Sequence, residues 1–198
     1  PFRMIDSELA SGDDDYLVDC LAMLKSIISQ MARNETRLND TERGLIDQAV
    51  NRAHMEIKLY IAEVNRRSPA PTDIERGALL ADYAGNLEHA GDLVAKTMME
   101  LASEKAAKQL QFSAAGWREM TNLHARVVSN LQIAMSVLVS GDVESARQLL
   151  QEKVRMRELE RESQARHLER LRAGEPQSIE TSNMHLEITR ALKEFNSL

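Results

Sequence analysis

The sequence has little of what tight turns, β-structure and covalent cross-links require. Its 198 residues include 8 Gly, 4 Pro and 1 Cys, and aromatic residues make up only 4%. The single cysteine, Cys20, excludes an internal disulfide and favours a reducing compartment. Hydrophobic residues still make up 43% and charged residues 28%, which is a globular balance. The profile therefore predicts an all-α fold built of long helices.

Excess positive charge and long apolar runs are also missing. The net charge of -6 argues against a general nucleic-acid binder, because phosphate backbones are neutralised by basic surfaces. The longest uncharged run, 127–141, is shorter than the ~20 apolar residues that a membrane helix needs. Residues 1–15 are polar and acidic and do not form a secretory signal. We therefore expect the polypeptide as written to be soluble.

Apolar residues recur at helical spacing in six segments of the chain. The expected helices cover about 14–33, 40–65, 74–105, 117–138, 143–172 and 179–197. Prolines 69 and 71 separate the second helix from the third, and Gly141 with Asp142 forms the turn before the fifth. Gly174 and Pro176 end the fifth helix. Residues 1–13 lack the periodicity and are expected to be a flexible lead-in.

The six helices form two triplets that can be laid over each other with an offset of about a hundred residues. Asp40 then matches Asp142, and Glu56 matches Glu158. We interpret this pattern as a duplicated unit, with a first three-helix repeat over 14–108 and a second, degenerate one over 109–198. The predicted architecture is two tandem antiparallel three-helix bundles.

One carboxylate pair stands out in the segment 74–105. Glu88 and Asp92 are four residues apart, so they project side by side from adjacent helical turns. Small or apolar residues surround them on that strip, and a partner helix could cover them. Carboxylate oxygens suit hard metal ions, which two such groups can bridge. The alternative, that each carboxylate pairs with Arg or Lys across a helix interface, stays open.

Two stretches resemble a known family. Residues 86–92, Asn-Leu-Glu-His-Ala-Gly-Asp, resemble the Glu-x-x-x-Asp signature of PhoU-family helical bundles. Residues 181–197 are similar to the end of the PhoU-like cytoplasmic domain of bacterial sodium/phosphate (Na/Pi) cotransporters. The resemblance implies a domain at the cytoplasmic face of the cell membrane, attached to a membrane transporter portion of the same polypeptide. It also implies a divalent or trivalent metal ion, such as Fe, Mn, Mg or Zn, bound through acidic pairs.

The family pattern also implies a second acidic pair on the middle helix of the bundle. Its best match is Asp47 with Asn51, where an amide replaces one carboxylate. The metal site implied by the resemblance therefore comprises Glu88, Asp92, Asp47 and Asn51. The second repeat cannot offer such a site, because its matching positions are Lys193, Ser197, Leu149 and Lys153.

The histidines are weaker candidates. We expect His89 on the polar side of its helix and His124 as a hydrogen-bonded core residue. His54, His167 and His185 lack the His-x-x-x-His or Glu-x-x-His spacing of a compact metal site. None of the five is a convincing catalytic base.

Two arginines of the fifth helix fall in line with apolar residues. Arg157 and Arg161 share a row with Leu150, Val154, Ala165 and Leu168. We therefore expect both to be partly covered, in an interhelical ion pair or, as the alternative, against an anion.

Three functions fit these observations. The first is a regulatory domain of a sodium-dependent phosphate transporter, which acts by protein contact and metal binding. The second is a free-standing PhoU-like regulator that docks on a phosphate ABC transporter or a sensor kinase. The third, a metal-binding helical-bundle enzyme of the di-iron kind, ranks last because it needs Glu-x-x-His motifs on two helices and the sequence has none. We expect a homo-oligomer, although no motif specifies one, and the sequence does not decide whether phosphate contacts this domain.

Overall fold

The computed structural model describes residues 55, 58–63, 66 and 71–198. This part of the chain contains helices and no strands, which confirms the all-α prediction. The helices expected over 14–33 and 40–65 lie wholly or mostly outside the described residues, as do Cys20 and the lead-in 1–13. The PhoU-like pair of bundles and the two repeat boundaries therefore stay predictions.

One long helical segment runs through the centre of the chain. It consists of α3 (Pro71–Asp92), the π-helix η1 (Leu93–Met98) and α4 (Met99–Ala107), which follow one another without a loop. The segment contains the helix expected over 74–105 and starts at Pro71, where a missing N–H costs no hydrogen bond. The π-helix was not predicted. It follows directly after Asp92, and it buries Leu93, Val94, Ala95 and Met98.

Four further helices complete the described part. They are α5 (Ala114–Ser140), α6 (Val143–Arg172), α7 (Pro176–Glu180) and α8 (Ser182–Phe195). The predicted turn between α5 and α6 is confirmed, because Gly141 is left-handed with φ 66° and Asp142 caps α6 by accepting from the amides of Glu144 and Ser145. The helix expected over 179–197 is divided at Thr181 into α7 and α8.

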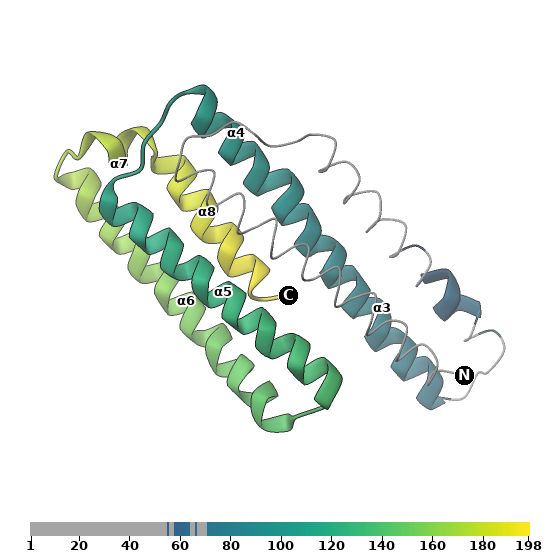
Figure 1. Ribbon diagram of the computed structural model, residues 1–198. Helices are drawn as coiled ribbons and strands as arrows, with labels where there is room; N and C mark the ends of the chain where they lie inside the picture. The colour runs from purple at the N-terminus through teal and green to yellow at the C-terminus, as the bar shows by residue number, and fades with distance from the viewer. Residues whose placement is uncertain (1–54, 56–57, 64–65, 67–70) are drawn as a thin grey trace.

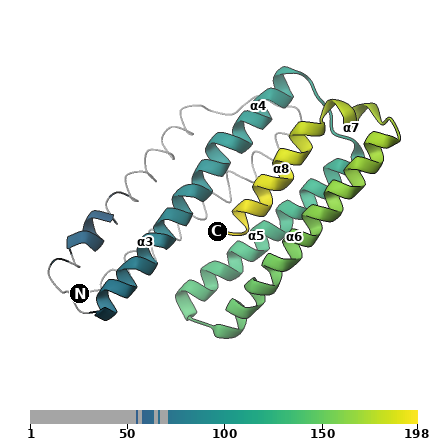
Figure 2. The ribbon, with the colours of Figure 1, turned by 180° about the vertical axis from the view of Figure 1, so that it is seen from behind.

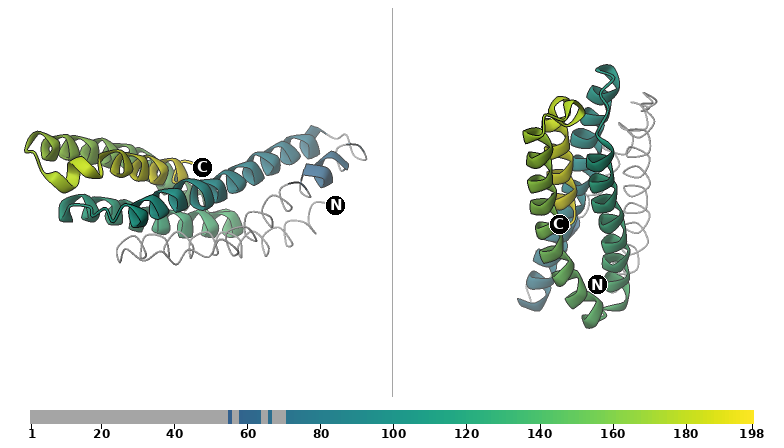
Figure 3. Two further views of the ribbon diagram at one scale, coloured as in Figure 1. Left: turned by 90° about the horizontal axis from the view of Figure 1, so that it is seen from above. Right: turned by 90° about the vertical axis from the view of Figure 1, so that its left-hand side faces the viewer.

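The helices α5, α6 and α8 pack against one another. Figures 1 and 2 show α5 and α6 as an antiparallel pair with α8 beside them, and α8 also contacts η1 of the long segment. Figure 3 shows that the first turns of α3 extend past the C-terminal end of α8. The first half of α3 thus lies away from α5 and α6.

A single apolar core joins these helices. Met98 of η1, Met120 of α5, Met156 of α6 and Ile188 of α8 are each at most 2% exposed and belong to one cluster. Burying a side chain of this size contributes about 1.5–3 kcal/mol relative to leaving it exposed. The core thus continues from the long segment, expected to belong to the first repeat, into the helices of the second.

The face of α6 that packs differs from the predicted one. Leu150, Val154 and Leu168 are 67%, 55% and 52% exposed, and Arg157 and Arg161 are exposed as well. The prediction that Arg157 and Arg161 are partly covered was wrong. The buried residues of α6 are instead Met156, Glu160, Ser163 and His167. Hydropathy did not reveal this face because three of its four residues are polar and find their partners on α5 and α8.

None of the helices in the part of the chain that the structure describes is long and apolar enough to span a membrane.

Candidate functional site

The carboxylate of Glu119 is the centre of a polar cluster between α5 and α6. Its Oε1 accepts from Arg166 Nε at 2.9 Å and from Arg170 Nη1 at 2.8 Å. Its Oε2 accepts from Arg170 Nη2 at 3.2 Å and from Ser163 Oγ at 3.0 Å. Burial alone raises the pKa of Glu119, but the hydrogen bonds from Arg170, Arg166 and Ser163 outweigh it and hold the pKa below its ordinary value. Glu119 is therefore ionised at neutral pH.

Two histidines lie behind this carboxylate and are almost completely buried. The rings of His167 on α6 and His185 on α8 stack with their centroids 4.6 Å apart and their planes 11° apart. Burial, together with the neighbouring His167, lowers the pKa of His185 to about 4. Burial and the charge of Arg170 also lower the pKa of His167. Both imidazoles are thus neutral at pH 7.

Each imidazole has a hydroxyl partner. His185 Nε2 lies 3.2 Å from Ser163 Oγ, and His167 Nε2 lies 2.8 Å from Ser182 Oγ. The Ser163 hydroxyl donates its proton to Glu119, so it can only accept from His185. This assigns the single ring proton of the neutral His185 to Nε2, which donates to Ser163 Oγ. The buried polar groups of the cluster therefore satisfy one another.

Serine, histidine and a carboxylate meet here, but not in the geometry of a catalytic triad. Glu119 Oε2 is 3.6 Å from His185 Nε2, the same ring nitrogen that faces Ser163. In a triad the two partners occupy opposite ring nitrogens, so that the imidazole can take the serine proton while the carboxylate orients it. This arrangement instead fixes α5, α6 and α8 relative to one another.

The cluster extends to the start of α5. Arg170 Nε donates to Ser178 Oγ at 3.2 Å, and Ser178 Oγ lies 3.1 Å from the Oγ of Ser113, the N-cap of α5. A Cβ on Gly116 would lie 3.3 Å from His185 Nδ1 and 3.2 Å from Ser113 Oγ. Glycine at this position thus allows α5 to approach the histidine closely.

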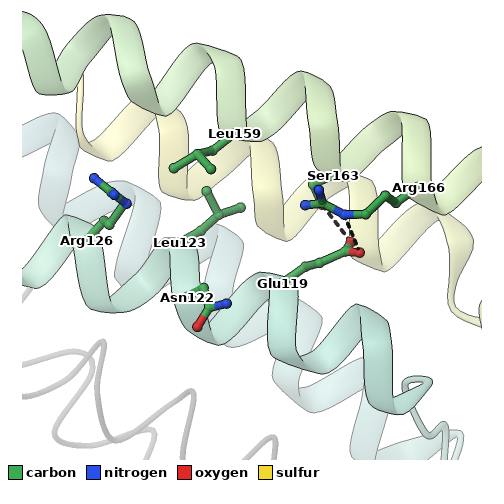
Figure 4. Close-up of a pocket in the computed structure, with 7 residues that line it drawn as sticks. All are labelled: Glu119, Asn122, Leu123, Arg126, Leu159, Ser163 and Arg166. Carbon is green, nitrogen blue, oxygen red and sulfur yellow. Dashed lines mark hydrogen bonds and ion pairs between the residues drawn. The ribbon is translucent and has the colours of Figure 1, made fainter.

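A cavity of about 370 Å³ opens beside Glu119 (Figure 4). Its wall consists of Glu119, Asn122, Leu123 and Arg126 from α5 and Leu159, Ser163 and Arg166 from α6. Arg126 pairs with Glu152 at 2.7 Å, and Arg166 pairs with Glu119. The arginines that line the cavity are therefore already engaged by carboxylates of the chain.

The structure places the predicted metal ligands Glu88 and Asp92 on α3, directly before η1. Both are half-buried, and Asp92 Oδ1 lies 2.6 Å from Nζ of Lys96, which is four residues further along in η1. Asp92 thus pairs within the continuous segment of α3 and η1 and not across a helix interface. Asp47 and Asn51 lie outside the described residues, and within those residues no three His, Cys, Asp or Glu side chains converge as metal ligands. The four-residue metal site stays a prediction.

The structure also describes two histidines outside the Glu119 cluster, His89 and His124. His89 is exposed, as predicted, and its Nε2 lies 2.9 Å from Glu194 Oε1 of α8. His124 is half-buried on α5, and His54 lies outside the described residues.

The Glu119 cluster was not predicted from the sequence, although the sequence contains a signal for it. Ser163, His167 and Arg170 recur at spacings of four and three, which places them on one face of a helix. A polar row of this kind can be a packing face when other helices supply its partners. The partners, Glu119 and His185, are distant in sequence and could not be assigned to it.

The chain is similar to proteins named "Putative inorganic phosphate export protein YjbB". It is 37% identical over 180 residues to the one from Salmonella typhimurium and 35% identical over 180 residues to the one from Escherichia coli K12. Each match covers 91% of this chain and 33% of the relative, so the chain spans about a third of these relatives. No protein-family model matches the chain. No solved structure matches it either.

Proposed function

We propose that this chain is a PhoU-like domain of a phosphate-transport protein and that it regulates transport through contact with the rest of that protein. The observation that carries the proposal is the match over 180 residues to proteins named for inorganic phosphate export. In its finer form, the membrane part transports phosphate with sodium and this domain modulates it from the cytoplasmic face. The Glu119 cluster does not carry the proposal, because its serine and carboxylate share one histidine nitrogen and its groups hold α5, α6 and α8 together.

An attached domain is favoured over a free-standing regulator. The relatives carry the matching segment within a chain about three times as long, since the match covers 33% of their length. The complete reading frame tests this choice. Transmembrane helices encoded in the same frame support attachment, whereas a frame that begins directly before residue 1 and ends at residue 198 contradicts it.

Regulation by contact requires that this domain bind the remaining portion of the protein. The test is to express the membrane portion and the chain as separate polypeptides in one cell and to purify the tagged membrane portion. We expect the chain to copurify with it. Failure of the two to associate, with both present and folded, would contradict regulation through direct contact.

We further propose a metal ion at Glu88 and Asp92, with Asp47 and Asn51 as additional ligands. Such an ion would bridge carboxylates of two helices and so fix their distance. The second repeat supports this convergence. At the positions matched to Asn51 and Asp92, Lys153 Nζ donates to the backbone oxygen of Ser197 at 2.8 Å. Matching positions of the two helices therefore do meet in the described bundle.

Metal content of the chain purified without chelator tests the proposed ion. We expect stoichiometric metal in the wild type and its loss in a Glu88→Ala/Asp92→Ala variant that retains its helical content. Equal metal content in the two proteins, or none in either, would contradict the site. In that case the Asp92–Lys96 pair is a surface feature of the junction between α3 and η1.

A further inference from the structure

The outward side of α6 carries an uncovered row of apolar and basic residues. Leu150 and Val154 lie one turn apart at 67% and 55% exposure, and Arg157 and Arg161 continue the row. Within the part of the chain that the structure describes, neither arginine makes a hydrogen bond or ion pair. We call these four residues the α6 face. A partner for this face needs apolar side chains flanked by carboxylates.

The first turns of α3 carry the complementary combination. Leu79 is 67% exposed and Ile74 is 46% exposed, and the acidic residues Glu75 and Asp82 are exposed beside them. Among the described residues, neither carboxylate has a hydrogen-bond or ion-pair partner. We call these four residues the α3 face. It belongs to the part of α3 that extends past the end of α8 (Figure 3).

We propose that the α3 face of one copy of this chain docks on the α6 face of a second copy. Charge and spacing support this assignment. Leu79 precedes Asp82 by three residues, and Val154 precedes Arg157 by three. Two helices laid parallel can therefore bring the apolar pair and the opposite charges together at once. Packing of this kind combines burial of apolar surface with electrostatic complementarity.

A contact between two α6 faces is less favourable. In a parallel pair of α6 helices the arginines of the two copies would lie against each other, and in an antiparallel pair they would lie against Leu150 and Val154 of the other copy with no carboxylate of the α6 face to pair with. The α3 and α6 faces also lie on different helices at opposite edges of the described fold (Figure 1). The contact is therefore heterologous. The assemblies should grow as the protein concentration rises, because each added copy leaves one face open, unless the copies close into a ring.

A charge-swap experiment on the full chain tests the proposal. The variant Glu75→Arg/Asp82→Arg has two basic faces, and the variant Arg157→Glu/Arg161→Glu has two acidic faces. Sedimentation velocity over a broad concentration series should show self-association of the wild type. In each variant alone we expect this association to weaken at least ~10-fold, because like charges then meet. An equimolar mixture of the two variants restores opposite charges at every contact between unlike copies, so association should return.

Matched variants control for the change in net charge. Arg118→Glu/Arg190→Glu and Glu100→Arg/Glu187→Arg alter exposed residues of other helices by the same charge, and both should associate like the wild type. Circular dichroism checks that every variant keeps its helical content. A wild type that stays monomeric up to the highest concentration overturns the proposal, as does a mixture that fails to associate. Binding of monomeric wild type to anionic lipid vesicles, lost on Arg157→Glu/Arg161→Glu, would also overturn it and assign the α6 face to a membrane surface.

Discussion

Replacement of Glu119 by glutamine should destabilise the fold more than any other single charge removal among the ion pairs described above. The side chain of Glu119 is 10% exposed and that of Arg170 is 13% exposed, so this pair lies mostly out of water. The Glu119→Gln change would remove the nearer carboxylate partner of Arg170, leaving Glu175 Oε2 at 3.7 Å from its Nε, and would offer one acceptor oxygen where the carboxylate offers two. Removing one partner of a buried ion pair costs about 3–5 kcal/mol. We expect about 3 kcal/mol, at the low end, because the second arginine, Arg166, is 46% exposed and can be solvated.

The assay is urea unfolding followed by far-ultraviolet circular dichroism at several pH values. Because the folded pKa of Glu119 lies below its ordinary value of 4.5, the stability that the carboxylate contributes is fully present above pH 4.5. It is lost as the pH falls through the lower folded pKa. The stability difference between wild type and Glu119→Gln should therefore be largest near neutral pH and shrink in acid.

Glu162→Gln is the matched control. Glu162 is 48% exposed, and its carboxylate is 3.6 Å from Arg166 and 3.8 Å from Arg155, so its removal should cost less than about 0.5 kcal/mol. If Glu119→Gln and Glu162→Gln have the same free energy of unfolding at pH 7, the reasoning about the buried cluster is refuted. A difference that does not change with pH would refute the assigned ionisation of Glu119.

Three more predictions follow from single contacts. Because the pKa of His185 falls from 6.5 to about 4 on folding, about 3 kcal/mol of the free energy of unfolding is present above pH 6.5 and is lost as the pH falls towards 4. The urea midpoint of His185→Gln should therefore depend less on pH between 6.5 and 4 than that of the wild type. Gly116→Ala should lose about 1 kcal/mol by crowding buried groups, whereas Gly85→Ala, with nothing within 4 Å of the new methyl group, should gain about 0.5–1 kcal/mol; thermal unfolding of the two variants distinguishes them. Met156→Ala should cost about 2–5 kcal/mol because its side chain is 0% exposed, and Arg157→Ala should cost under about 0.5 kcal/mol; equal losses in denaturant titrations would contradict the orientation of α6.

Local chemistry made several helix ends predictable from the sequence. Asp142 caps α6 by accepting from the amides of Glu144 and Ser145, which are its close neighbours in sequence. Gly141 and Gly174 adopt the positive φ at which the chain leaves a helix. These effects depend on neighbours in sequence. The predicted range 143–172 for the fifth helix is accordingly confirmed.

The orientation of α6 could not be predicted in the same way. Leu150, Val154 and Leu168 form a regular apolar row, yet the packed face carries Ser163 and His167. A polar face can be buried when every polar group finds a partner, and here the partners lie on other helices. Hydropathy measures the cost of burial for a side chain but not the hydrogen bonds that offset it.

The π-helix η1 also lacked a sequence signal. Its residues Leu93–Met98 are apolar apart from Lys96 and Thr97, and an ordinary α-helix would accommodate them. Its position directly after Asp92 was therefore not anticipated. The candidate metal pair could be predicted as neighbours on one strip, but Lys96, four residues after Asp92, was not identified as the partner of that carboxylate.

Phosphate transport by the complete protein tests the proposed regulatory role most directly. The measurement is the release of labelled phosphate from cells that carry the complete protein, compared with cells in which its segment equivalent to residues 14–198 is deleted and the proposed membrane part is present at the same level. We predict that the deletion changes the transport rate or its dependence on internal phosphate. Transport that is identical in rate and in phosphate dependence would contradict a regulatory role for this domain.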